Sequence, residues 1–298
     1  MPAYRAVLFD FFGTLTRAVR RGPGHRAVAE ALGCDPAVLV DVLDRSYYPR
    51  AGGALGDAEA TLRWVAGQAG TRPSEAGVRA ARLARERAVA ADIRLRPDAV
   101  AVLRRLRHLG VRTAVVSDCT HELPLLLPTL PIAPLLDARV FSVEVRRCKP
   151  DPEIFLTACR RLDVDPADCL YVGDGGSREL SGAAGAGLHP VRLAAADLAG
   201  HLVFDPEPDW SGPVVKTLAE VPALVAGGGS GAPAPAAGRP GTAGWARDRA
   251  AHRPDHHPAA GRGPEEGRRG LGERRRRAGV RGVVPVPRRR AVRGERPG

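Results

Sequence analysis

Three short apolar segments, each followed by polar residues, constrain the fold of this 298-residue chain more than any other feature. They cover 4–9, 112–116 and 169–172, and their β-branched and apolar residues indicate buried strands. Apolar residues at helical spacing fill the intervals, for example at 97–110 and 151–162. Strands that alternate with helices predict an α/β fold with a doubly wound parallel sheet, buried on both faces.

Polar residues stand just past the ends of these predicted strands. Asp10 and Ser117 directly follow the first two strands, and Asp174 comes shortly after the third. In an open parallel sheet, the ligand crevice lies outside the carboxyl ends of the strands. We therefore expect Asp10, Ser117 and Asp174 to belong to one site, although they are far apart in the sequence.

The positive charge of the chain is concentrated near its C-terminus. The formal net charge is +12, but residues 226–298 hold 17 Arg against 6 Asp and Glu, which leaves residues 1–225 at +1. The same segment has 16 Gly, 9 Pro and no helix or strand period, so we expect it to be disordered. Three interpretations of this tail stay open: an inert solvated extension, an arm that binds anions or nucleic acid weakly and non-specifically, and a read-through or wrong-frame translation of GC-rich coding sequence.

Several classes of protein are disfavoured by composition. No apolar run reaches the roughly 18 residues needed to span a bilayer, and the N-terminal residues lack the layout of a secretory signal. The five cysteines form no C-x-x-C pair, which argues against a disulfide framework and a thiolate zinc site. We expect a cytoplasmic protein with no membrane partner, and no nucleic-acid partner for the nearly neutral residues 1–225.

A long helical insertion separates the first two predicted strands. Apolar residues recur three and four apart in four segments, at 24–33, 35–48, 57–70 and 74–90. Asp35, which precedes a proline, and Ser74, which precedes a glutamate, are typical of helix starts. Because the insertion begins directly after the first strand, we expect it to lie over the crevice as a lid.

Four motifs occur in a fixed order along the chain: FDFFGTLT from Phe9, VVSD from Val115, CKPDPEIF from Cys148 and YVGDGGSREL from Tyr171. With these motifs and the helical insertion between the first two, the chain resembles the haloacid dehalogenase superfamily of hydrolases, in the branch with a helical cap. The resemblance covers about residues 4–225. It implies a Rossmann-like hydrolase core at 1–16 and 97–225, a cap at 17–96 and a separate low-complexity tail at 226–298.

The resemblance also implies catalytic roles for motif residues. Asp10 matches the nucleophile that attacks phosphorus and forms an aspartyl-phosphate. Lys149 matches the lysine that neutralises this nucleophile and the phosphoryl oxygens, and Ser117 matches the hydroxyl that donates a hydrogen bond to a phosphoryl oxygen. Thr14 and Asp118, which belong to the same motifs, are expected to contact the substrate.

A divalent cation is implied as well, because a carboxylate and a phosphate repel each other unless positive charge lies between them. The expected ion is Mg²⁺. Its expected ligands are Asp10, Asp174 and the backbone carbonyl of Phe12, with Glu179 holding metal-bound water. The alternative for Glu179 is a solvent-facing acid in the first turn of a helix, where the helix dipole favours negative charge.

Phe12 departs from the family's phosphatase pattern, D-x-D-x-T, in which a second Asp protonates the leaving group. Loss of a general acid typically lowers the rate about 10²- to 10⁴-fold. The substrate is then an acyl or aryl phosphate, whose leaving group needs little protonation, or another group such as Asp118 replaces the missing acid. Two alternatives are a dehalogenase-like carbon hydrolase, although the intact Gly173 and Asp174 argue against it, and a weakly catalytic protein that binds a ligand or partner. Imine-based phosphonate cleavage is set aside because residues 17–96 contain no lysine.

Substrate choice is assigned to the insertion, where Arg45, Tyr48 and Arg50 combine polar reach with aromatic surface. Packing on a helix surface is the alternative for all three. The sequence as a whole predicts an Mg²⁺-dependent hydrolase of a small phosphorylated metabolite.

Overall fold

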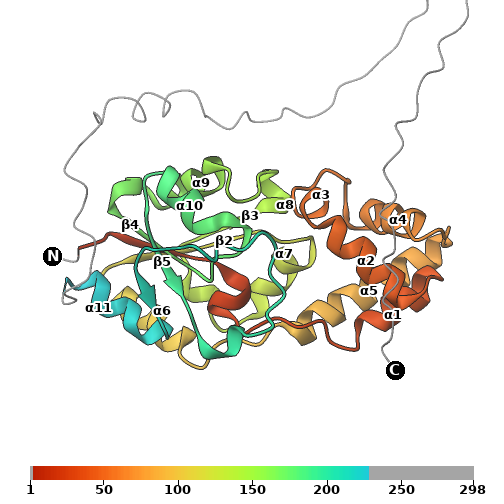
Figure 1. The fold of residues 1–298 in the computed structure, drawn as a ribbon, viewed down its shortest axis with the longest axis horizontal. Coiled ribbons are helices and arrows are strands. Elements are labelled where there is room, and N and C mark those ends of the chain that lie inside the picture. The colour runs from red at the N-terminus through yellow and green to blue at the C-terminus, as the bar shows by residue number, and fades with distance from the viewer. Residues whose placement is uncertain (1–2, 228–298) are drawn as a thin grey trace, which may run out of the picture. The chain divides into compact units, whose positions relative to one another are not determined.

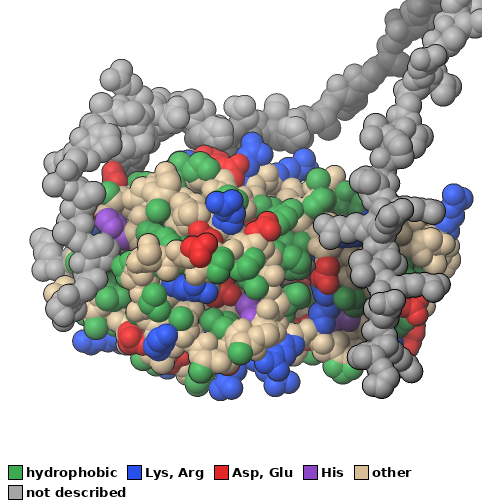
Figure 2. All heavy atoms as spheres, viewed as in Figure 1, with side chains coloured by type: hydrophobic (Ala, Val, Ile, Leu, Met, Phe, Trp, Pro, Cys, Tyr) green, Lys and Arg blue, Asp and Glu red, His purple; other side chains and the backbone are tan. Residues whose placement is uncertain are grey.

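The computed structural model describes residues 3–227 of the chain (Figure 1). The predicted disordered tail, apart from residues 226 and 227, lies outside the described residues. On the face drawn in Figure 2, basic and acidic side chains are interspersed, which agrees with the small net charge of residues 1–225. Within the described part, no helix is long and apolar enough to cross a membrane.

The centre of the fold is a six-stranded sheet in which every neighbouring pair is parallel. The strand order is β3-β2-β1-β4-β5-β6, and the predicted doubly wound sheet is thereby confirmed. The strands are β1 (Ala6–Phe9), β2 (Arg112–Ser117), β3 (Ala138–Phe141), β4 (Cys169–Gly173), β5 (His189–Leu193) and β6 (Val214–Val215). Ser117 is thus the last residue of β2 rather than the first residue beyond it.

Alternate strand residues point to opposite sides of the sheet, and helices cover both sides, so both faces are buried. In β1, Val7 and Phe9 join one apolar cluster, and Ala6 and Leu8 join another. Helices α6 (Ala99–His108) and α11 (Val221–Val225) lie on one side of the sheet, and α9 (Pro152–Leu162) and α10 (Glu179–Gly185) lie on the other (Figure 1). Each fully buried Leu or Phe contributes about 1.5–3 kcal/mol, so these clusters hold the strand ends in fixed positions.

Five helices form the insertion between β1 and α6: α1 (His25–Leu32), α2 (Pro36–Arg45), α3 (Tyr47–Ala51), α4 (Ala58–Gln68) and α5 (Glu75–Asp92). Four of them, α1, α2, α4 and α5, share an apolar cluster of their own, which includes Val28, Leu39 and Val65. The predicted helix starts at Asp35 and Ser74 are confirmed, because their side chains accept hydrogen bonds from backbone N–H groups of the first turn.

The helix predicted over 35–48 is interrupted at Ser46, and α3 begins one residue later. Pro49 explains the interruption, because it has no N–H to donate to the carbonyl of Arg45. Two shorter helices follow β2 and β3: α7 (Glu122–Leu126) and α8 (Ser142–Val145). Single helical turns lie at Phe11–Leu15, Leu127–Thr129, Ala133–Leu135, Pro166–Asp168, Gly176–Arg178, Ala196–Leu198 and Leu218–Glu220.

Two other parts of the chain contact the segment that enters the insertion. One is the segment that leaves the insertion, through an antiparallel bridge between Thr16 on the entering segment and Leu95 on the leaving segment. Residues 194–213, which we call the β5–β6 loop, contact the entering segment as well. The N–H of Ala18 donates to Asp197 Oδ2 (2.9 Å), and the N–H of Val19 donates to His201 Nδ1 (2.8 Å). A loop that follows β5 thus fixes the connection between the sheet and the insertion.

Candidate active site

Asp10 lies at the carboxyl end of the central strand β1. Its backbone N–H donates to the carbonyl of Val172 in β4 (2.9 Å), and the chain then turns sharply through Gly13 at a φ of 84°. A Cβ atom at position 13 would lie 2.6 Å from His201 Nε2 and 2.8 Å from Asp174 Oδ2. Only glycine fits both this backbone conformation and this close approach.

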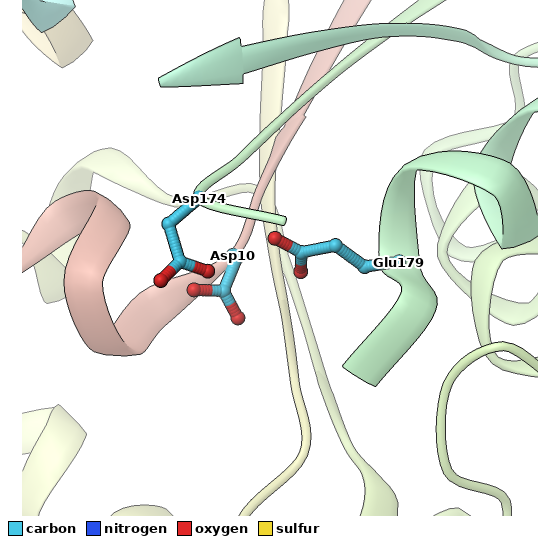
Figure 3. A group of neighbouring side chains, drawn as sticks. All are labelled: Asp10, Asp174 and Glu179. Atoms are coloured by element: carbon cyan, nitrogen blue, oxygen red, sulfur yellow. The ribbon is translucent and has the colours of Figure 1, made fainter. Parts of the chain in front are cut away.

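Three carboxylates converge at this point. Asp10, Asp174 and Glu179 come from the end of β1, the end of β4 and the first turn of α10, and they point toward one another (Figure 3). One oxygen from each lies within 4.8 Å of the other two. Asp10 Oδ2 is buried and has no hydrogen-bond partner among the described residues. The cluster therefore offers oxygen ligands for a cation.

Lys149 supplies one positive charge to the cluster. Its Nζ lies 2.6 Å from Asp10 Oδ1 and 2.6 Å from Glu179 Oε2, and its side chain is only 1% exposed. Burial lowers the pKa of Lys149, but the attraction of Asp10 and Glu179 outweighs burial and raises the pKa well above its ordinary value. When all three carboxylates are ionised, one ammonium leaves two negative charges, the charge that a single divalent cation would neutralise.

The pKa values of the acids reflect this excess of negative charge. Burial above all, with repulsion from Glu179 in addition, raises the pKa of Asp10 to about 7, although the charge of Lys149 opposes the shift. Burial, followed by repulsion from Glu179 and Asp10, raises the pKa of Asp174 well above its ordinary value. Both shifts follow from carboxylates held close together in a dry environment.

Glu179 is buried, so the solvent-facing alternative for this residue is wrong. Its side chain is 1% exposed, and its Oε2 accepts a hydrogen bond from the Tyr171 hydroxyl (2.7 Å) in addition to the Lys149 contact. Its Oε1 accepts from the N–H of Gly175 (2.9 Å). The helix that begins at Glu179 therefore directs this acid into the site rather than toward solvent.

Asp10, Lys149, Asp174 and Glu179 line a pocket, which we call the pocket at Asp10, and Asp118 at the end of β2 borders it as well. Asp118 Oδ1 accepts from the backbone N–H of Lys149 (3.0 Å), whereas Oδ2 is buried without a partner among the described residues. Burial raises the pKa of Asp118 to about 6. Ser117 is fully buried, and within the described residues its hydroxyl donates one hydrogen bond, to the carbonyl of Asp118 at 3.4 Å. Thr14 is also fully buried, but it does not border the pocket.

The insertion residues expected to choose the substrate lie in three different environments. The structure does not bring Arg45 to the site: its side chain is exposed and pairs with Asp41 (Nε to Oδ2, 3.2 Å). Tyr48 lies at the edge, with its hydroxyl 3.5 Å from Ser177 Oγ. Arg50 is buried and borders a cavity next to the pocket at Asp10.

Three further residues at the site were not anticipated from the sequence. The Tyr47 hydroxyl donates to the carbonyl of Asp118 (2.9 Å), and its ring stacks on Phe204 at 3.9 Å between ring centres. His201 lies beside Asp174 (Nε2 to Oδ2, 3.3 Å), and because its Nδ1 accepts from a backbone N–H, we assign the ring proton to Nε2. The sequence DRSYYPR indicated that an aromatic residue of the insertion lies at the site, but it did not indicate that this residue is Tyr47. The β5–β6 loop carries no motif.

The fold and the site define an α/β protein with an acidic, lysine-containing centre at the carboxyl ends of its strands. Residues 4–187 match the haloacid dehalogenase-like hydrolase family, and the chain belongs to that family. The expected family and its hydrolase class are thus confirmed.

Relatives of known activity fall into two groups. Glyceraldehyde 3-phosphate phosphatase of Methanopyrus kandleri is 37% identical over 98 residues, which are 33% of this chain and 42% of that protein. (S)-2-haloacid dehalogenase 1 of Pseudomonas sp. is 30% identical over 130 residues, which are 43% of this chain and 55% of that protein. The chain therefore spans about half the length of these relatives.

Solved structures share the fold. L-2-haloacid dehalogenase from Xanthobacter autotrophicus superposes with a TM-score of 0.51 at 22% identity, over 74% of this chain and 98% of that one. A haloacid dehalogenase-type phosphatase from Thermococcus onnurineus gives a TM-score of 0.51 at 20% identity, over 75% of this chain and 98% of that one. At this level of identity, the likeness establishes the architecture alone.

Proposed function

We propose that the protein is an Mg²⁺-dependent hydrolase of a small phosphorylated metabolite, acting through an aspartyl-phosphate on Asp10. The observation that carries this proposal is the cluster of Asp10, Asp174 and Glu179, in which Lys149 compensates only one of three negative charges. When all three are ionised, the two uncompensated buried charges cost several kcal/mol each, and a divalent cation would offset that cost.

The donor atoms fit Mg²⁺. All three side chains offer carboxylate oxygen, which this hard cation prefers, and Asp10 Oδ2 is a buried oxygen without a partner among the described residues. Asp10, Asp174 and the backbone carbonyl of Phe12 would hold the ion, and Glu179 would act through bound water. When bound, Mg²⁺ would offset the repulsion between the Asp10 carboxylate and the phosphate.

The residues of the chain then perform the displacement. One oxygen of Asp10 attacks phosphorus, and the bond from phosphorus to the leaving oxygen breaks. Lys149 stays on the other oxygen of Asp10, which fixes the direction of attack and compensates charge on the phosphoryl group. Water then hydrolyses the aspartyl-phosphate, which releases phosphate and restores Asp10.

Protonation of the leaving group is assigned to Asp118 instead of position 12. Phe12 has no proton to give, and its ring packs against Phe11 (4.9 Å between ring centres). Asp118 borders both the pocket at Asp10 and the neighbouring cavity, and its Oδ2 has no hydrogen-bond partner among the described residues. Because burial raises its pKa to about 6, part of the population carries a proton near neutral pH.

Phosphate release from acetyl phosphate and from 4-nitrophenyl phosphate tests the proposal, with Mg²⁺ and with chelator, beside Asp10→Asn. Metal-dependent release that the substitution abolishes supports it. Asp118→Asn should slow hydrolysis of an alkyl phosphate at least tenfold more than that of acetyl phosphate, whose leaving group needs no proton.

Carbon–halogen hydrolysis is the second candidate. It is favoured by Phe12, since a halide leaves without a proton, and by the likeness to dehalogenases. Chloride release from 2-chloropropanoate, unaffected by chelator and accompanied by no phosphate release, would replace the phosphatase proposal with this one.

A further inference from the structure

A second cavity lies next to the pocket at Asp10. Its volume is about 120 Å³, and it shares Phe12, Tyr47 and Asp118 with that pocket. Residues of the insertion form its far wall, among them Arg50 and Arg85. A group bonded to a phosphate at Asp10 would extend into this cavity, which has room for only a few heavy atoms.

Arg50 is a buried cation in the wall of this cavity that lacks a counter-ion. It is 3% exposed, and no carboxylate among residues 3–227 forms an ion pair with it. Its Nε donates to Ser46 Oγ (3.1 Å), and its Nη2 donates to the carbonyl of Leu43 (2.7 Å). These two neutral acceptors fix the guanidinium in place, while Nη1 has no acceptor in the described part of the chain.

The other basic side chains around the cavity have acidic partners within the described part of the chain. Arg85 Nε lies 3.0 Å from Glu122 Oε1, and His25 Nε2 lies 2.8 Å from Asp92 Oδ2. Arg21 pairs with Asp44. Among the described residues that line the cavity, Arg50 is therefore the cation without an ion-pair partner.

Burial disfavours the charged form of Arg50, and this lowers its pKa. Burial, and then repulsion from Arg85, lowers the pKa of Arg50 to about 9. A buried charge without a partner destabilises a fold by several kcal/mol, so an anion that enters the cavity recovers free energy that the empty protein lacks. One guanidinium balances one negative charge, which fits a carboxylate better than a second phosphate.

We propose that Arg50 forms a subsite for a carboxylate on the substrate's leaving group, so that the substrate is a small phosphorylated carboxylic acid. This inference rests on the proposed phosphatase function. With phosphorus at Asp10, the carboxylate lies in the 120 Å³ cavity beside it. Tyr47 and Phe12 border the chain of carbon atoms between the two anions.

The test compares two substrates of equal length, 3-phosphoglycerate and glycerol 3-phosphate, which differ by a carboxylate in place of a hydroxymethyl group. Steady-state kinetics with Mg²⁺ on the full chain should give a kcat/KM for 3-phosphoglycerate about 10- to 100-fold higher, the value of one charge-assisted hydrogen bond. In Arg50→Gln the kcat/KM values for the two substrates should differ by no more than about threefold. Arg26→Gln, at an exposed position of the same insertion, should keep the preference.

Equal use of both substrates by the wild-type protein, or the same preference in Arg50→Gln, would overturn the subsite. If Arg50→Gln does not fold, Arg50→Lys replaces it and should retain only part of the preference, because lysine keeps the charge but not the planar fork.

A binding measurement separates this inference from the proposed function. Calorimetric titration should show that lactate binds the wild-type protein at least tenfold more tightly than 1,2-propanediol does, and that Arg50→Gln abolishes the difference. Absence of phosphate release from acetyl phosphate refutes the phosphatase alone. Equal binding of lactate and propanediol refutes the carboxylate subsite alone.

Discussion

Replacement of Lys149 by methionine tests the electrostatic account of the site most directly. Methionine has a similar length and fills the same space, but it removes the ammonium that contacts Asp10 and Glu179 at 2.6 Å. The three carboxylates then have no compensating charge. Removal of one partner from a buried ion pair costs about 3–5 kcal/mol, so we expect Lys149→Met to lower the free energy of unfolding by this amount in chelator at pH 8.

The loss should depend on pH and on metal in a defined direction. Protonation removes the repulsion, and burial already raises the pKa of Asp10 to about 7, so the loss should be smaller at pH 5 than at pH 8. Millimolar Mg²⁺ should stabilise Lys149→Met more than the wild-type protein, because the ion meets one more uncompensated negative charge.

Urea unfolding followed by tryptophan fluorescence measures these changes. The chain has only one other lysine, the exposed Lys216, and Lys216→Met is the matched control, with an expected change below about 0.5 kcal/mol. Asp10→Asn introduced into Lys149→Met should recover part of the loss. A loss below about 1 kcal/mol at pH 8 in chelator would refute the account of an uncompensated acidic cluster.

Three further substitutions test other parts of the site. Burial raises the pKa of Asp118 from 3.8 to about 6, so the folded protein holds this proton more tightly than the unfolded chain; this stability is present below pH 4 and lost as the pH rises through 6. Relative to Asp118→Asn in chelator, the wild-type protein should lose about 2 kcal/mol of unfolding free energy from pH 4 to pH 7, and parallel pH profiles would contradict this. Arg96→Met should cost about 2–4 kcal/mol in urea unfolding, because two buried carbonyls, those of Gly13 and Thr14, lose their donor; a loss below about 1 kcal/mol would contradict this. Phe204→Ala should cost about 1–2 kcal/mol through the lost ring stack, and a change no larger than that of its exposed neighbour after Val203→Ala would contradict the role of the stack.

The arrangement of the acidic centre could be predicted because it depends on strand ends. Asp10 and Asp174 directly follow β1 and β4, which are hydrogen-bonded neighbours in the sheet. Once the apolar runs are assigned as parallel strands, the topology brings both carboxylates to one edge. The direction of the Glu179 side chain could not be predicted from the strand order, because the tight turn before α10 determines whether it points into the site or toward solvent.

The insertion and the β5–β6 loop could not be predicted to the same depth. A break at Ser46 rotates the residues after it, so the helical period found upstream did not show that Tyr47 rather than Tyr48 contacts Asp118. His201 and Phe204 lie in a loop without a motif or a period. The hydrogen bond from the N–H of Val19 positions His201, and the stack on Tyr47 positions Phe204; no local pattern encodes either contact.

This loop also determines which parts of the chain can be exchanged between relatives. Asp197, His201 and Phe204 lie after β5, yet their partners belong to the entry segment and to α3 of the insertion. A chimera that received only residues 17–96 of another family member would leave these three side chains facing foreign surfaces. The insertion and residues 194–213 therefore form one structural unit built from two segments of the chain. A chimera that exchanges both segments together keeps the contacts between them.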